Sequence, residues 1–267
     1  MVASLDSVRQ KIERANQHIE ELKAAVLAFK ATDPYKISTK RNPQTRELVY
    51  YIVSAEPIPA PIAAILGDIL QNLRSVLDHL AYQLFIAAGG DPAKSAHIYF
   101  PIFDDISAYK AKSLGKVQGI KQNAIDAIDA IKPYKGGNDT LWLLHKLNNI
   151  DKHRLVITVG AAFSEFNIGQ HLGAVKVREL LESKGIPLPP QFPDVYMRTR
   201  DRMFPLKAGD ELFIDAPDAK ENEDIKFLCD IAFGEPGISE GESIIETVQG
   251  MADLVTQIVF DFKALLA

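Results

Sequence analysis

Apolar residues recur at alternating intervals of three and four along residues 5–29, the spacing that places side chains on one face of an α-helix. They are Leu5, Val8, Ile12, Ala15, Ile19, Leu22, Val26 and Phe29. A helix with one apolar face packs against other helices, and Asp33-Pro34 should end it because a residue before proline disfavours the α conformation. The chain therefore begins with an element that is typical of a helical bundle.

The same spacing predicts further helices. They cover about residues 59–88, 104–114, 121–131, 138–153 and 241–266. Gly89-Gly90-Asp91-Pro92 should end the first of these, and Asn138 or Asp139 is placed to cap the fourth. We expect the long helices to form one bundle.

Two other parts of the chain have the composition and alternation of β-strands. The expected strands are a hairpin within residues 35–55, then 155–163, 172–178, 195–203, 211–215 and 225–233. The hairpin should turn at Arg41-Asn42-Pro43-Gln44. In the last strand every second residue from Ile225 to Phe233 is apolar, which places Cys229 on the buried face as a structural residue.

Together these patterns predict an α+β fold, a helical bundle with an antiparallel β-rich insertion packed on one side or end. We expect a single discontinuous unit, with a helical core of residues 1–34, 56–154 and 239–267. The hairpin of residues 35–55 and the insertion of residues 155–238 would complete it.

Charge is distributed unevenly along the 267 residues, whose net charge is −5. Residues 1–208 hold 27 Lys or Arg against 21 Asp or Glu, whereas residues 209–267 hold 3 against 14. The net charge argues against broad attraction of nucleic acid to the whole surface, but the basic larger part can still bind an anion.

The expected setting is the cytoplasm. A single cysteine excludes an intramolecular disulfide, and we expect no disulfide-linked partner. The first residues lack the apolar core of a signal peptide, and no apolar run approaches the length of about 18 residues that predicts a membrane span, so no membrane contact is expected. The nucleotide-binding, nucleophile-elbow and zinc-protease motifs are absent, and we expect no cofactor.

Polar side chains form a stripe on each of two predicted helices. On the helix expected at residues 59–88 the stripe is Asp68, Asn72, Ser75, His79 and Tyr82. On the helix expected at residues 138–153 it is His145, Asn149 and His153. If these helices are neighbours, the stripes form either an open polar cleft or a buried hydrogen-bond network. The candidate binding residues are Asn72, Asp78, His145, Asn149, Asp151, Lys152 and His153.

Arg74 and His79, separated by four residues on an amphipathic helix, resemble the R-x4–6-H motif of the HEPN superfamily. The resemblance implies RNA binding or a metal-independent ribonuclease, with His79 as the general base on a ribose hydroxyl and Arg74 stabilising the phosphate. It also implies a homodimer. The chain is similar, too, to uncharacterised bacterial proteins that combine N-L-R-S-x-L-D-H with L-N-N-I-D-K-H-R.

Two other functions are compatible with the same residues. His79, His145 and His153 supply nitrogen ligands for a metal, or the two stripes line a small-ligand site inside the bundle. Alternatively the protein is a non-catalytic structural or interaction protein, in which both stripes only specify how the helices pack.

Overall fold

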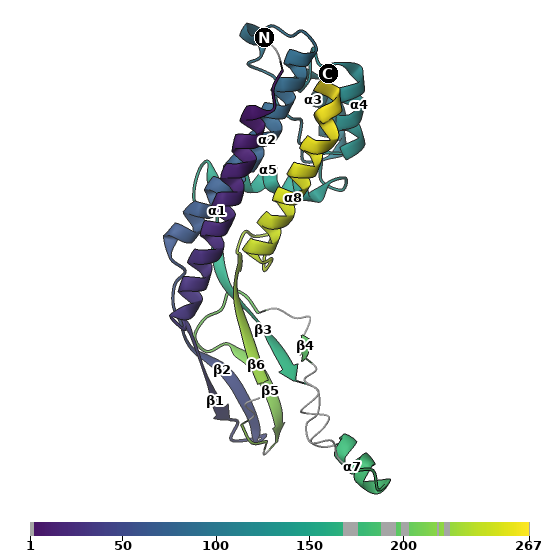
Figure 1. Cartoon of the computed structure of the whole chain (residues 1–267). Coiled ribbons are helices and arrows are strands. Elements are labelled where there is room, and N and C mark those ends of the chain that lie inside the picture. Colours follow the sequence, from purple (N-terminus) through teal and green to yellow (C-terminus); the bar gives the residue numbers. More distant parts are fainter. Residues whose placement is uncertain are drawn as a thin grey trace. The chain divides into compact units, whose positions relative to one another are not determined.

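The computed structural model confirms the predicted α+β fold and describes residues 3–167, 176–187, 196–198, 203–217, 219–221 and 225–266 (Figure 1). The sequence predicts one discontinuous unit, whereas the structure divides the chain into two compact units. Unit 1 comprises Met1–Leu27, Pro59–Thr158 and Glu235–Ala267, and unit 2 comprises Ala28–Ile58 and Val159–Gly234. Each unit has buried apolar residues of its own.

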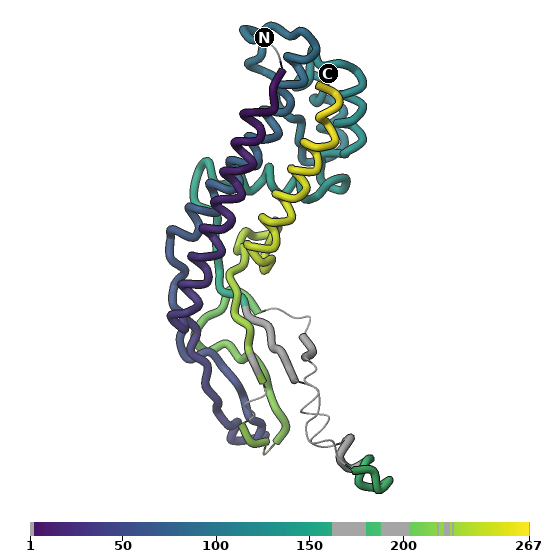
Figure 2. The backbone as a smooth tube through the Cα atoms, viewed as in Figure 1, coloured from purple at the N-terminus to yellow at the C-terminus, as the bar shows by residue number. Residues whose placement is uncertain are grey.

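Unit 1 is helical and brings together the start, the middle and the end of the chain (Figure 2). Its helices are α1 (Asp6–Ala31), α2 (Ala60–Ala87), α3 (Ile106–Lys116), α4 (Gln122–Ile131), α5 (Asp139–Asp151) and α8 (Ile244–Phe262). The short 3₁₀ helices η1 (Pro92–Lys94) and η2 (Lys263–Leu266) also belong to it, whereas the last residues of α1 belong to unit 2. None of the helices in the described ranges is long and apolar enough to cross a membrane.

Helix α2 lies at the centre of this unit. It packs against both α5 and α8, which also contact each other, and its apolar stripe is buried, with Leu66 and Leu80 fully inaccessible. Helix α1 runs alongside α2 (Figure 1), where Lys11 Nζ donates to Asn72 Oδ1 at 3.2 Å. The bundle predicted from helical spacing is therefore present in unit 1.

Side-chain caps fix where two helices of unit 1 begin. Asn138 Oδ1 accepts a hydrogen bond from Leu141 N at 3.1 Å and so caps α5, as the sequence predicts. Asp105 Oδ1 caps α3 in the same way through Ala108 N at 2.8 Å.

Unit 2 contains two three-stranded sheets. One has the order β1 (Tyr35–Arg41), β2 (Glu47–Ala55), β5 (Glu211–Pro217) and is antiparallel. The other has the order β4 (Tyr196–Arg198), β3 (Thr158–Asn167), β6 (Ile225–Phe233). The ring of Tyr50 packs against Phe213 and Phe227, with centroids 6.0 and 5.7 Å away, so it joins aromatic side chains of both sheets.

Most expected strands are confirmed, and one is wrong. Residues 176–178 begin helix α7 (Lys176–Ser183) because Val177, Leu180 and Leu181 have helical spacing, while residues 172–175 lie outside the described part of the chain. Of the strand expected at residues 195–203, β4 covers residues 196–198, and residues 195 and 199–202 also lie outside the described part. Cys229 is half-buried rather than fully buried, and its burial raises the pKa of the thiol to about 11, as suits an unreactive cysteine.

Glu235 joins two segments of unit 1 that are distant in sequence. Its carboxylate is 1% exposed and accepts hydrogen bonds from both terminal nitrogens of Arg154, at 2.9 and 2.7 Å, and from Ile157 N at 2.7 Å. Burial alone would raise the pKa of this carboxyl, but these donors outweigh burial and hold it below its usual value. The pair fixes the segment that follows α5.

Candidate functional site

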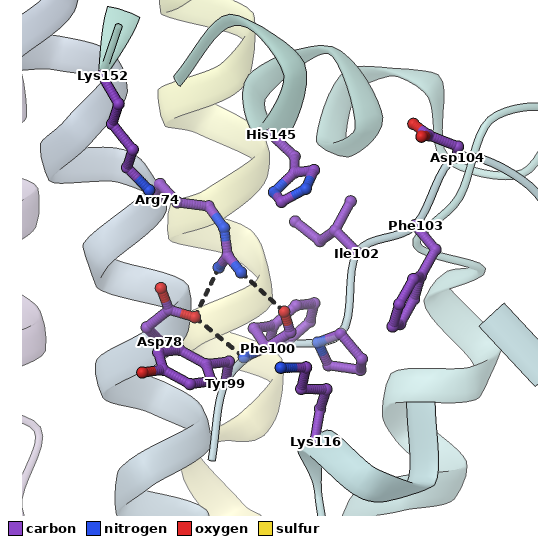
Figure 3. Close-up of a pocket in the computed structure, with 11 residues that line it drawn as sticks. Arg74, Asp78, Tyr99, Phe100, Ile102, Phe103, Asp104, Lys116, His145 and Lys152 are labelled. Carbon is purple, nitrogen blue, oxygen red and sulfur yellow. Dashed lines mark hydrogen bonds and ion pairs between the residues drawn. The ribbon is translucent and has the colours of Figure 1, made fainter. Parts of the chain in front are cut away.

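A pocket of about 400 Å³ opens in unit 1 beside α2 (Figure 3). Arg74 and Asp78 of α2, residues 99–104 and Lys116 of α3 line it. His145 of α5 and Lys152, which directly follows α5, complete the lining. Three helices and one irregular segment therefore contribute to it. Of these, α5 is held against α2 by the packing described above.

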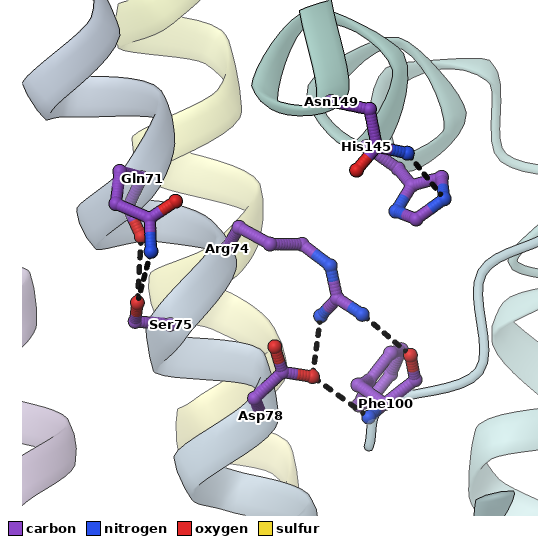
Figure 4. Close-up of polar contacts among 7 residues, drawn as sticks. All are labelled: Gln71, Arg74, Ser75, Asp78, Phe100, His145 and Asn149. Carbon is purple, nitrogen blue, oxygen red and sulfur yellow. Dashed lines mark hydrogen bonds and ion pairs between the residues drawn. The ribbon is translucent and has the colours of Figure 1, made fainter. Parts of the chain in front are cut away.

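Arg74 and Asp78 form the floor of the pocket, because residues four apart share one face of a helix. Arg74 Nη1 lies 2.8 Å from Asp78 Oδ1, and Arg74 Nη2 donates to Phe100 O at 2.9 Å. Asp78 Oδ1 also accepts from Phe100 N at 3.0 Å, so this pair satisfies both backbone polar groups of Phe100 (Figure 4). The pair therefore positions residues 99–104, which form one wall of the pocket.

Burial affects both members of this pair. It lowers the pKa of Arg74, an effect that Asp78 opposes, and it raises the pKa of Asp78 against the opposing effects of Arg74 and the Phe100 N–H. The second carboxylate oxygen, Asp78 Oδ2, accepts no hydrogen bond from any residue that the structure describes. The Asp78 side chain is 27% exposed, so this oxygen is the polar group of the floor that remains open to a ligand.

His145 is a neutral imidazole in this site. Burial, followed by repulsion from Arg74, lowers its pKa to about 4. Its Nε2 lies 3.0 Å from Asn149 Nδ2, while Nδ1 is buried without a partner among the described residues (Figure 4). At neutral pH the ring therefore adds no charge to the pocket.

Two lysines supply the uncompensated charge. Lys116 Nζ lies 5.1 Å from the centroid of the Tyr99 ring, a cation–π contact, and Lys152 is exposed just after α5. Neither forms an ion pair with a carboxylate in the described ranges. Asp104, the second acid of the pocket, pairs with Lys146 at 2.7 Å, and the hydrogen bond from that lysine lowers its pKa. The pocket as a whole therefore favours an anion.

The structure brings together only some of the residues expected from the sequence. Arg74, Asp78, His145 and Lys152 line the pocket, and Asn149 reaches it through His145. The remaining candidates, Asn72, His79, Asp151 and His153, do not line it.

The geometry of α2 and α5 explains these exceptions. His79 follows Arg74 by five residues, which places it roughly 140° around the helix. Asn72 is buried and donates to Asp68 O at 2.8 Å. Asp151 packs on Gly67 of α2, and His153 is exposed beyond the end of α5.

Sequence reasoning missed Lys116 and the wall of residues 99–104. Residues 99–103, Tyr-Phe-Pro-Ile-Phe, have neither helical nor alternating spacing, and their position depends on contacts of Phe100 with α2, 22 and 26 residues earlier. The aromatic run around Pro101 was the available signal that this segment is buried in part.

No three His, Cys, Asp or Glu side chains converge in the described ranges to hold a metal, so the alternative site of His79, His145 and His153 is not formed. Comparison of the chain with protein-family models, with curated proteins and with solved structures finds no match.

Proposed function

We propose that the pocket binds a phosphate-bearing ligand, either a free nucleotide or a nucleotide unit of RNA. The observation that carries this proposal is the pair of lysines, Lys116 and Lys152, which reach one pocket from different elements without a carboxylate partner among the described residues (Figure 3). Ammonium groups are common phosphate ligands. Tyr99 and Phe103 add aromatic surface next to them, which suits a nucleobase.

The resemblance of Arg74 and His79 to the HEPN motif favours RNA as the source of the phosphate. It assigns cleavage to those two residues and assembles the site across a homodimer. In this chain Arg74 holds Phe100 and His79 lies outside the pocket, so the proposal concerns binding and does not include cleavage. Light scattering of the purified protein tests the homodimer separately.

Calorimetry with inorganic phosphate, 5′-AMP and a ten-nucleotide single-stranded RNA tests the proposal. Each charged hydrogen bond contributes about 1.5–3 kcal/mol, so we expect Lys116→Ala and Lys152→Ala each to weaken binding of AMP by about tenfold or more. The matched control is Lys112→Ala, an exposed lysine of α3 that does not line the pocket and should leave the affinity unchanged.

Each outcome separates the rival functions. RNA that binds much more tightly than AMP, with the same dependence on the two lysines, identifies RNA as the ligand. Affinities that are equal in the wild type and the double lysine variant would refute the proposal. Absence of binding to all three ligands would favour the structural or interaction protein.

A further inference from the structure

Asp78 uses only one of its carboxylate oxygens in the fold. Oδ1 contacts both Arg74 Nη1, at 2.8 Å, and Phe100 N, at 3.0 Å. Oδ2 has no hydrogen-bond partner in the part of the chain that the structure describes, although Asp78 lines the pocket and only 27% of its side chain is exposed. Oδ2 is not one of the buried polar atoms that lack a partner, so it keeps contact with solvent and can accept a hydrogen bond from a ligand.

We propose that Asp78 Oδ2 accepts a hydrogen bond from a ribose hydroxyl of the ligand, so that the pocket selects phosphate esters of ribose over esters that lack this hydroxyl. This inference rests on the proposed binding of a phosphate-bearing ligand. It assigns the two polar ends of one ligand to two parts of the pocket. The phosphate lies on a lysine, and the sugar lies on the floor between Lys116 and Lys152 (Figure 3).

The charges around Asp78 support a neutral donor at this position. Arg74 already compensates the carboxylate, and Lys152 is close enough to contribute to its electrostatics. A hydroxyl donates a hydrogen bond without adding charge, whereas a further cation would be repelled by both side chains. Burial, which raises the pKa of Asp78, also strengthens its hydrogen bonds because water competes less for the oxygen.

The floor of the pocket also keeps Oδ2 in place. Rotation of the carboxylate would break the contacts of Oδ1 with Arg74 and with the backbone of Phe100 (Figure 4). The acceptor is therefore held in one position before the ligand arrives, which reduces the entropy lost on binding.

The first test needs no protein variant. Calorimetry compares 5′-AMP with 2′,3′-dideoxy-AMP, which carries the same base and phosphate but no ribose hydroxyl, and 2′-deoxy-AMP then identifies which hydroxyl is bound. A hydrogen bond to a charged acceptor predicts about tenfold tighter binding of AMP. For RNA as the source, ten-nucleotide RNA and DNA of one sequence make the same comparison.

The second test replaces the acceptor. In Asp78→Asn one oxygen can still accept from Phe100 N, while the charged acceptor on the pocket side is lost. Because removal of a negative charge changes the affinity for every phosphate ester, the readout is the ratio of the two affinities. We expect this ratio to fall from about tenfold to less than about threefold.

The outcomes separate this inference from the function on which it rests. Equal affinities for AMP and the dideoxy ester, both weakened by Lys152→Ala, would overturn the role of Asp78 and keep phosphate binding. A ratio that survives in Asp78→Asn would also overturn it. Absence of any binding would overturn both.

A spectroscopic measurement covers the case in which Asp78→Asn does not fold. The carboxyl ¹³C signal of Asp78 in the wild-type protein should shift more on addition of AMP than on addition of the dideoxy ester, because only AMP donates a hydrogen bond to the carboxylate. An Asp78 signal that responds equally to both esters would contradict the proposal.

Discussion

Arg74 illustrates at the scale of one residue why a motif alone does not assign a role. The residue is 7% exposed, and its guanidinium pairs with Asp78 and donates to the carbonyl of Phe100. Through these contacts Arg74 positions the wall of residues 99–104. The cations that a ligand can reach are Lys116 and Lys152. An arginine on an amphipathic helix looks the same in the sequence whether it binds a ligand or a backbone carbonyl.

His145 gives a pH-dependent stability that belongs to one side chain. Its pKa is about 4 in the folded protein against 6.5 for the unperturbed group, because burial and Arg74 disfavour its protonated form. As the pH falls below about 6.5, the unfolded chain takes up the proton first. The contribution of His145 to the free energy of unfolding should therefore decrease as the pH falls from about 6.5 to about 4. Below about pH 4 this contribution should no longer change with pH.

Urea unfolding of the wild type and His145→Gln at several pH values measures this effect. The difference between the two curves isolates His145, since the acids titrate in both proteins and the substituted glutamine side chain stays neutral throughout. The slope of this difference should not exceed about 1.4 kcal/mol per pH unit. A difference that does not change with pH would contradict the low pKa of His145.

At the scale of elements, a glycine of α2 makes room for a side chain of α5. A Cβ atom at Gly67 would lie 2.3 Å from Asp151 Oδ1, so the Asp151 carboxylate keeps its position only because residue 67 has no side chain. Gly67→Ala should therefore destabilise the protein by about 1–2 kcal/mol, although alanine favours a helix by about 1 kcal/mol. Thermal or urea unfolding measures the change.

Gly250 of α8 is the matched control, because a Cβ atom there would meet nothing within 4 Å. Gly250→Ala should stabilise the protein by about 0.5–1 kcal/mol. Combining Gly67→Ala with Asp151→Ala should remove most of the cost of the first change. If Gly67→Ala is as stabilising as Gly250→Ala, the close contact of the Asp151 carboxylate with Gly67 is absent.

The predictable parts of this protein are those that depend on local spacing. The hairpin, the strand at residues 225–233 and the start of α5 at Asn138 follow from alternation or a capping residue. The pocket does not, because Phe100 meets Arg74 and Asp78 across more than twenty residues of chain. The polar stripe predicted on α2, which includes Asn72 and His79, does not line the pocket, and Lys116 belongs to no pattern that links it to α2 or α5.

At the scale of the whole molecule, the net charge says less about the ligand than the positions of the charged side chains do. The net charge of −5 argues against broad attraction of nucleic acid to the whole surface, yet Lys116 and Lys152 both line one pocket whose two acids are already paired. Attraction of a phosphate depends on the charges within about 8 Å at physiological salt, the range beyond which screening dominates. An acidic protein can therefore contain a basic pocket.

The division into two units, each with its own buried residues, predicts that they unfold separately. Trp142, the single tryptophan, lies on α5 and reports on unit 1. Leu77→Ala, at a fully buried position of α2, should lower the stability seen by tryptophan fluorescence by about 2–5 kcal/mol. Ile52→Ala, equally buried in β2 of unit 2, should leave that transition nearly unchanged and shift only the transition seen by circular dichroism of the strands. Equal shifts of the tryptophan signal in both variants would instead show that the whole chain unfolds as one cooperative unit.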